Sequence, residues 1–363
     1  MDEDKQVGGV ERKKRSGNFD WSMHYFRGFA IVCIVLTHLT LEVGRAWLHT
    51  ALFGASTIFF LFISGYLCKF LDMKKKTNTG VYYKKKFLNV ILPYFVCSAI
   101  TIALVYCTGV PHIKLFNPFA ASAGDWIRVF AYGRAQSSYW YIPFVSILFL
   151  ISPLLLRLSG PVMCVVTMIG FVFSIIFPSR GYPFTISWPN TFYLFTYFFP
   201  SYCLGFVYAE YREKIENAYF RFWWVLAALS FMVFSALVFC AVGATPSLGL
   251  HMCDAPLARS VEKLLLIGVA IRAFSVIKSK RVALLDAFAE YSFTIYFLHR
   301  FFISDAIFVR GWVGDRLGLV NWNSLLGAGV DVVLYSAYIF LMLLLAMVLK
   351  TAFGKYSRSF IGS

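Results

Sequence analysis

Ten long apolar segments dominate the sequence, and no other feature restricts its fold as strongly. They lie at residues 26–47, 51–70, 87–109, 138–157, 161–178, 191–209, 222–243, 257–277, 285–309 and 325–349. A helix needs about 20 mostly apolar residues to cross the hydrocarbon core of a bilayer. Inside that core only helices and closed barrels satisfy every backbone polar group. The segments therefore predict an all-α integral membrane protein with about ten transmembrane helices.

Composition agrees with a membrane protein and argues against a zinc or disulfide scaffold. Apolar side chains make up 59% of the 363 residues and charged ones 14%, whereas a soluble chain has roughly 45–50% and about 25%. The eight cysteines form no CxxC or CxxH pair, and a cysteine inside an apolar span behaves as a small hydrophobic residue. We therefore expect no metal site.

The net charge of +16 is concentrated in short linkers between the apolar segments. Basic clusters occur at 11–15, 74–76, 84–86 and 278–281. An excess of Lys and Arg marks the cytoplasmic side of a membrane protein, and an even number of spans then places both termini in the cytoplasm. The charge is therefore interpreted as topological, with membrane lipids and not nucleic acid as its partner.

The chain reads as one membrane domain with two short tails. No linker rich in Pro, Gly or Ser, no internal repeat and no soluble domain interrupts the apolar segments. The predicted organisation is a basic cytoplasmic tail at 1–25, a ten-helix domain at 26–350 and a short cytoplasmic tail at 351–363.

The first apolar segment carries ionisable residues on one face of its predicted helix. Arg27 and His38 are eleven residues apart, which is about 16 Å along a helix and close to a whole number of turns. Glu42 follows one turn after His38, and Arg45 lies three residues further on. Ionisable groups in hydrocarbon are costly and usually mark a functional site, although snorkelling to the headgroups also explains Arg27. A histidine one turn from a carboxylate suits a general base, and equally a proton relay in a transporter.

Five stretches, in order along the chain, resemble the acyltransferase-3 family of membrane acyltransferases. They are HYFRGFAIVCIVLTH (24–38), FFLFISGYL (59–67), YYKKKFLNVILPYF (82–95), SYWYIPFVSILFLISPLL (138–155) and FAEYSFTIYFLH (288–299). The first holds the family's Arg-x10-His pattern as Arg27 and His38. The third departs from the family, because Lys86 and Asn89 replace its usual Arg-x-x-Arg pair. Lys keeps a charge but loses bidentate recognition of phosphate or carboxylate, and Asn loses the charge.

The resemblance implies acyl transfer, usually of acetyl, from cytoplasmic acyl-CoA. The acceptor implied is a hydroxyl of a surface glycan or of its lipid-linked saccharide precursor. Acetyl-CoA is then a donor substrate, and no bound cofactor is expected. The resemblance is to stand-alone members without an extracytoplasmic hydrolase-like domain, in a bacterial-type inner (plasma) membrane.

A thioester is already activated, so the enzyme has to supply a base and a place for the donor. Our hypothesis makes His38 the general base, acting on the acceptor hydroxyl or through a covalent intermediate. Arg27 would hold a CoA phosphate or position the thioester. Glu42 would orient His38 or tune its basicity.

Further candidates come from the other motifs. Lys86 and Lys85 would attract the polyanionic end of CoA, although topology and anionic lipids also explain the lysine clusters. Candidate acceptor contacts or supporting residues are Glu290, Tyr139, Trp140 and His299. Tyr139 and Trp140 would stack on a sugar or on adenine, or else belong to the interfacial aromatic belt. Glu290 and His299 lie nine residues apart and face opposite sides of one continuous helix.

Two other classes of function compete with acyl transfer. A transporter or flippase for a charged or glycosidic solute explains intramembrane Arg, His and Glu equally well, but the sequence shows no inverted repeat and no matched pair of broken helices. A non-catalytic assembly or sensor protein would leave the face of Arg27 and His38 without a task.

Overall fold

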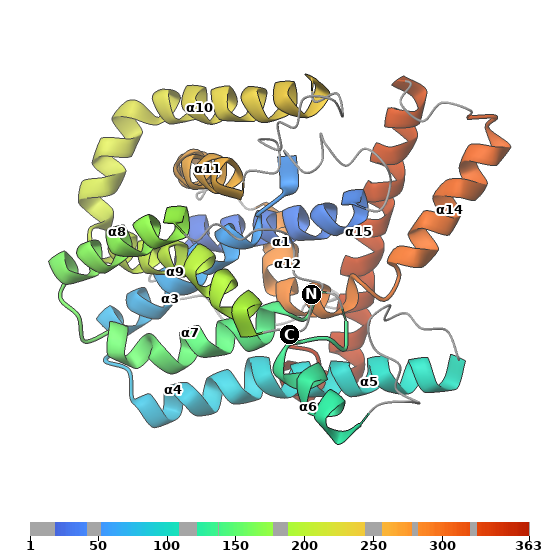
Figure 1. Ribbon diagram of the computed structural model, residues 1–363, viewed down its shortest axis with the longest axis horizontal. Coiled ribbons are helices and arrows are strands. Elements are labelled where there is room, and N and C mark those ends of the chain that lie inside the picture. Colours follow the sequence, from blue (N-terminus) through green and yellow to red (C-terminus); the bar gives the residue numbers. More distant parts are fainter. Residues whose placement is uncertain are drawn as a thin grey trace, which may run out of the picture.

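The computed structural model describes residues 19–41, 52–108, 122–136, 138–176, 188–243, 256–277, 282–319 and 325–362. Helices supply the regular structure of this part of the chain (Figure 1), and no strand occurs within these ranges. The predicted all-α class is therefore confirmed.

A helix lies at each of the ten predicted apolar segments. In chain order the elements are α1 (Trp21–Leu41), α3 (Thr57–Lys74), α4 (Thr79–Lys86), the π-helical turn η1 (Phe87–Ile91), α5 (Leu92–Thr108), α6 (Ala123–Ala131), α7 (Tyr141–Leu155), α8 (Gly160–Ile176), α9 (Trp188–Glu210), α10 (Arg212–Gly243), α11 (Pro256–Ile277), α12 (Ala283–Glu290), α13 (Ser292–Leu298), α14 (Ile303–Arg316), α15 (Leu325–Phe353), the 3-10 turn η5 (Gly354–Tyr356) and α16 (Ser357–Phe360). The first helix begins at Trp21, ahead of the predicted start at 26.

The ninth predicted segment, 285–309, is divided and is not one helix. Tyr291, with φ −93° and ψ 8°, separates α12 from α13. The chain turns again between Leu298 and α14. Neither Pro nor Gly marks these breaks, so apolar periodicity alone predicted a continuous span. As a result, His299 lies at the C-terminal end of a short helix.

A π-helical turn interrupts the third predicted segment just before Pro93. Proline has no backbone N–H and cannot bond to the carbonyl four residues earlier, and η1 occupies the turn where that bond is missing. Short π-helical turns inside α-helices are frequent at functional sites. Lys86 is the last residue of α4, at the start of this irregular turn.

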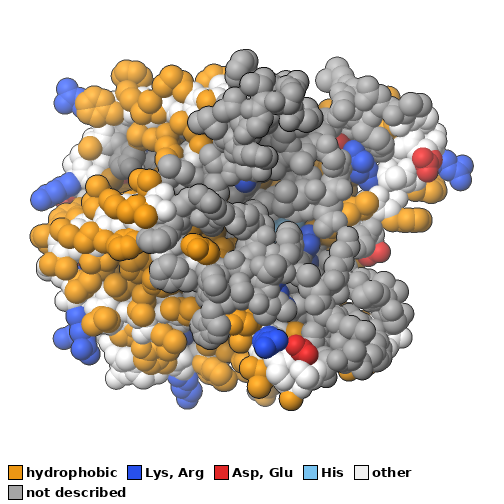
Figure 2. Space-filling view, viewed as in Figure 1, with side chains coloured by type: hydrophobic (Ala, Val, Ile, Leu, Met, Phe, Trp, Pro, Cys, Tyr) orange, Lys and Arg blue, Asp and Glu red, His pale blue; other side chains and the backbone are white. Residues whose placement is uncertain are grey.

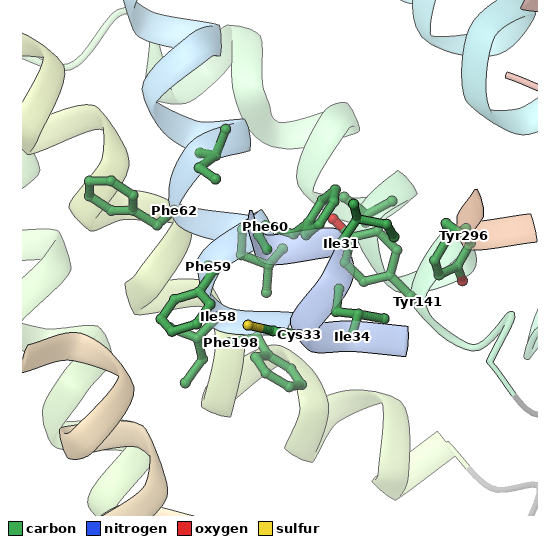
Figure 3. Packing of buried hydrophobic residues seen from close by; sticks show 14 of the residues in the cluster. Ile31, Cys33, Ile34, Ile58, Phe59, Phe60, Phe62, Tyr141, Phe198 and Tyr296 are labelled. Atoms are coloured by element: carbon green, nitrogen blue, oxygen red, sulfur yellow. The ribbon is translucent and has the colours of Figure 1, made fainter. Parts of the chain in front are cut away.

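The core forms where α1 and α3 meet the surrounding helices. α1 packs against α3, α11, α12 and α13, and α3 packs along α9. The α3–α9 contact is close because both helices present a glycine. A Cβ on Gly65 would lie 2.0 Å from the carbonyl oxygen of Tyr202, and a Cβ on Gly205 would lie 2.2 Å from that of Phe62. Figure 3 shows side chains of α1 and α3 interleaved in this core, with Ile34 beside Tyr141 of α7.

Four helical stretches among the described residues are long and apolar enough to cross a membrane. They are Trp21–Leu39, Thr79–Leu104, Arg221–Val238 and Leu326–Phe353, and two shorter apolar helices are α7 and α8. Figure 2 shows apolar side chains gathered over the part of this face where α8, α9 and α10 lie. Exposed apolar side chains include Met168 on α8 and Phe231 on α10, which is the surface that lipid would cover. The full count of ten spans stays a prediction.

Candidate active site

Arg27 lies on α1, in a stretch long and apolar enough to cross a membrane, and has no carboxylate partner in the described parts of the chain. Its side chain is half-buried, and the guanidinium lies over the ring of Phe293 on α13, 5.5 Å from the ring centroid. The positive charge of Arg358 acts on it, and the Tyr141 hydroxyl lies nearby. An arginine kept in such a place without a counter-ion is suited to bind an anionic group from outside the chain.

His38 lies further along the same helix, at a small cavity between α1, α3, α7 and α13. The polar side chains that line this cavity with His38 are Thr57, Ser138, Trp140, Tyr141 and Tyr296, and apolar side chains complete it. Its volume is about 20 Å³, enough for a group the size of a water molecule. Figure 3 shows Tyr141 beside Ile34, which is one turn of α1 before His38, and Tyr296 on the other side of Tyr141.

Arg27 and His38 are connected through shared neighbours. Phe293 lies under the Arg27 guanidinium and also lines the cavity of His38. Tyr141 lines the cavity too, and its hydroxyl lies within the electrostatic reach of Arg27. Phe293 and Tyr141 therefore link the surroundings of Arg27 with the cavity at His38.

His299 is the ring neighbour of His38. The two ring centroids are 5.0 Å apart, with 38° between the ring planes. The His299 side chain is buried, and its Nδ1 lies 2.7 Å from the backbone oxygen of Tyr296. The hydroxyl of Tyr338 donates a hydrogen bond to the backbone oxygen of His299. Sequence spacing placed His299 near the outer end of a long helix and gave no sign of this contact.

Lys86 joins the basic side of the site, and Arg358 is a residue that sequence reasoning missed. The Lys86 ammonium lies 4.1 Å from the centroid of the Phe149 ring, and the charge of Arg27 acts on it. Arg358 belongs to α16, which folds back against η1 and α5. Gly362 brings the same segment against Phe293, because a Cβ there would lie 3.1 Å from the Phe293 Cβ. Only the tertiary fold brings these cations together.

The other predicted residues have different surroundings. Lys85 is exposed, and Glu290 pairs with Lys350 of α15 at 2.5 Å. Tyr139 is fully buried, and its hydroxyl donates to the backbone oxygen of Phe297 at 3.0 Å. Trp140 lines the cavity and stacks on Phe198, with 5.7 Å between the ring centroids. Glu42, Arg45 and any role of theirs lie outside the described residues.

An ion-pair network fixes the start of α1. Asp20 accepts hydrogen bonds from Arg212 of α10 and from the hydroxyl of Tyr66 on α3. Arg212 also pairs with Glu216, with 2.7 Å between Nε and Oε1. His24 bonds to the buried Asp286 of α12 at 2.8 Å. These partners are far apart in sequence, so no local motif announces them, and together they hold the helix that carries Arg27 and His38.

Within the described ranges, no group of three or more His, Cys, Asp or Glu side chains is arranged to hold a metal ion. The site therefore consists of cations, two histidines, hydroxyls and aromatic rings. These groups can bind an anionic donor and move a proton.

Comparison with known proteins rests on one family. No curated protein and no solved structure matches the chain. The acyltransferase domain family matches residues 20–351, a range that begins at the Asp20 network and includes Arg27, His38 and His299. The chain therefore belongs to the acyltransferase-3 family and is a membrane acyltransferase.

Proposed function

We propose that the protein transfers an acetyl group from cytoplasmic acetyl-CoA to a hydroxyl of a surface glycan or of a lipid-linked saccharide precursor. The observation that carries the proposal is that one helix, α1, holds both Arg27 and His38. Arg27 has no carboxylate partner in the described chain, and His38 lines a cavity. Family membership supplies acyl transfer, and these two residues supply a donor contact and a base.

Arg27, Lys86 and Arg358 form the proposed contact to the donor. CoA carries several phosphate groups, and Arg27 lies within electrostatic reach of both Lys86 and Arg358, an arrangement that favours a polyanion. Lys86 replaces an arginine of the family pattern, so it acts here as a point charge and not as a bidentate fork. The pantetheine arm would then reach past Phe293 and Tyr141 to place the thioester at His38.

His38 is the proposed general base. It takes the proton of the acceptor hydroxyl while the oxygen forms a bond to the thioester carbon. The carbon–sulfur bond then breaks, and the CoA thiolate leaves with the proton that His38 had taken. The small cavity at His38 admits only the reacting hydroxyl of a sugar acceptor, and the half-buried ring of Trp140 offers a face to the rest of the sugar.

His38→Ala is expected to lower acyl transfer by about 10²- to 10⁴-fold, which is the range that a general base contributes. The measurement follows label from radioactive acetyl-CoA into a membrane glycan extract with purified full-length protein. His24→Gln is the matched control, because it changes another histidine of α1 and keeps a donor for Asp286. It should retain activity.

Full transfer by correctly folded His38→Ala would refute the proposed base. Glycan crossing the membrane without any transfer of label would refute acyl transfer itself and indicate a flippase.

A further inference from the structure

His299 has one ring nitrogen engaged and one open. Its Nδ1 lies 2.7 Å from the backbone oxygen of Tyr296. A carbonyl oxygen only accepts hydrogen bonds, so Nδ1 carries the proton and Nε2 of the neutral ring is an acceptor. Nε2 is buried and has no hydrogen-bond partner among the described residues.

The ring of His299 is held firmly in this orientation. Besides the Nδ1 bond, its backbone oxygen accepts from the Tyr338 hydroxyl of α15. The preceding turn is fixed because the hydroxyl of Tyr296 donates to the backbone oxygen of Ser138 at 2.6 Å. These hydrogen bonds therefore fix the orientation in which His299 Nε2 is left as an acceptor. An unsatisfied buried acceptor destabilises a protein, so its retention favours a partner during the reaction.

His38 is a ring neighbour of His299 and can supply a donor for that acceptor. Its ring centroid lies 5.0 Å from that of His299, and the planes are inclined by 38°. A centroid separation of 5.0 Å is short enough for an N–H···N hydrogen bond between the two rings when their nitrogens face each other. His38 is half-buried and lines the cavity.

We propose that His299 is a positioning residue that accepts a hydrogen bond at Nε2 from one ring nitrogen of His38. The proposal rests on the proposed role of His38 as base. The bond fixes the tautomer of His38, so that its second nitrogen has a free electron pair directed at the acceptor hydroxyl. During transfer His38 gains the hydroxyl proton and later gives it to the CoA thiolate, and His299 only holds the other N–H. This is the orienting role that sequence spacing assigned to Glu42.

Two substitutions separate the nitrogens of His299. His299→Asn keeps a donor for the Tyr296 carbonyl but removes the acceptor at the Nε2 position. His299→Gln reaches the Nε2 position with an amide oxygen that accepts. Transfer of label from acetyl-CoA to the glycan extract is measured at saturating donor, together with the apparent KM for acetyl-CoA and the thermal unfolding midpoint in detergent.

We expect His299→Asn to lower the rate at saturating donor on the order of 10²-fold, the lower end of what a general base contributes, with the KM for acetyl-CoA unchanged. His299→Gln should recover part of the rate. In a His38→Ala background, His299→Asn should produce no further loss, because residues that act as one unit are not additive. Thr294→Ala is the control, since it trims a buried side chain of the same helix whose hydroxyl has no partner in the described chain.

Several results would overturn the positioning role. They are full activity of folded His299→Asn, the same fold-loss in the His38→Ala background as in the wild type, or a loss by His299→Gln as large as that by His299→Asn at equal unfolding midpoints. If His38→Ala itself keeps full activity, the proposed base fails first, and the two failures are distinguished.

Discussion

Most buried charges of the described residues are compensated, and this makes Arg27 distinctive. Asp331 of α15 accepts two hydrogen bonds from Arg310 of α14, at 2.7 and 3.4 Å. Glu262 and Lys263 pair with each other on α11. A buried charge left alone is costly, so nearly every ion is paired where only stability is at stake. The half-buried Arg27 guanidinium has an aromatic ring beneath it and no counter-ion in this part of the chain. This is expected of a residue that we propose to bind an anionic donor.

At this scale we predict the effect of removing one cation of the proposed donor contact. Lys86→Met should raise the apparent KM for acetyl-CoA about 10-fold and leave the rate at saturating donor unchanged, because a hydrogen bond to a charged group contributes roughly 1.5–3 kcal/mol. Lys75→Met is the matched control, since Lys75 is exposed just beyond α3. An unchanged KM in Lys86→Met, or an equal rise in both variants, would contradict the assignment.

For individual elements, the sequence predictions succeeded where they depend on local properties of one segment, and failed where packing between segments decides. The ten apolar segments located the helices, because the length and apolar character of a membrane helix are local properties. The position of Arg27 and His38 on one helix was also predictable from their spacing in the sequence. The break at Tyr291 was not, because no Pro or Gly marks it. The contact of His38 with His299 requires α13 to end against α1, which only packing between distant segments decides.

The α3–α9 contact gives a prediction for an element. Gly65→Ala should destabilise the protein by about 1–3 kcal/mol, because overpacking a tight contact forces backbone and side chains apart. The Cβ would meet the backbone oxygen of Tyr202 at 2.0 Å, and a backbone atom cannot rotate away. The unfolding midpoint in detergent and the yield of monodisperse protein measure the effect.

Gly329→Ala on α15 is the control for this substitution. A Cβ at Gly329 meets no atom within 4 Å in the described structure, and alanine favours a helix by about 1 kcal/mol over glycine. Gly329→Ala should therefore keep or raise the midpoint. A Gly65→Ala protein as stable as wild type would show that α3 and α9 separate easily.

At the scale of the whole molecule, the bilayer decides the arrangement of the helices. Four stretches satisfy length and apolarity without help. Other predicted spans are short, divided or, like α11 with its Glu262–Lys263 pair, carry ions. Ions inside a span are costly and usually face the protein interior. The distribution of Lys and Arg predicts a topology with both termini in the cytoplasm.

Cys107 offers a direct test of that topology. It is exposed near the C-terminal end of α5, which the positive-inside distribution places outside the cell. Cys253 lies between two predicted spans on the same predicted side, so the test uses a Cys253→Ser background. In that background a membrane-impermeant maleimide added to intact cells should label Cys107, and adding Cys107→Ser should remove the label. Lys75→Cys in the Cys107→Ser, Cys253→Ser background should be labelled only after the membrane is opened. Labelling of Lys75→Cys in intact cells would contradict the predicted orientation and indicate the reverse one.

The segment at 357–362 has a consequence for the timing of assembly. It lies against α5, η1 and Phe293, and it carries Arg358, whose charge reaches Arg27. The ribosome synthesises these residues after every helix that they touch. Until this segment has been made, the surroundings of Arg27 therefore lack the contacts of residues 357–362 and the charge of Arg358. A nascent chain would therefore contain the proposed base, His38, early in synthesis. Its proposed donor contact would be complete only when Arg358 has been added, after the other helices.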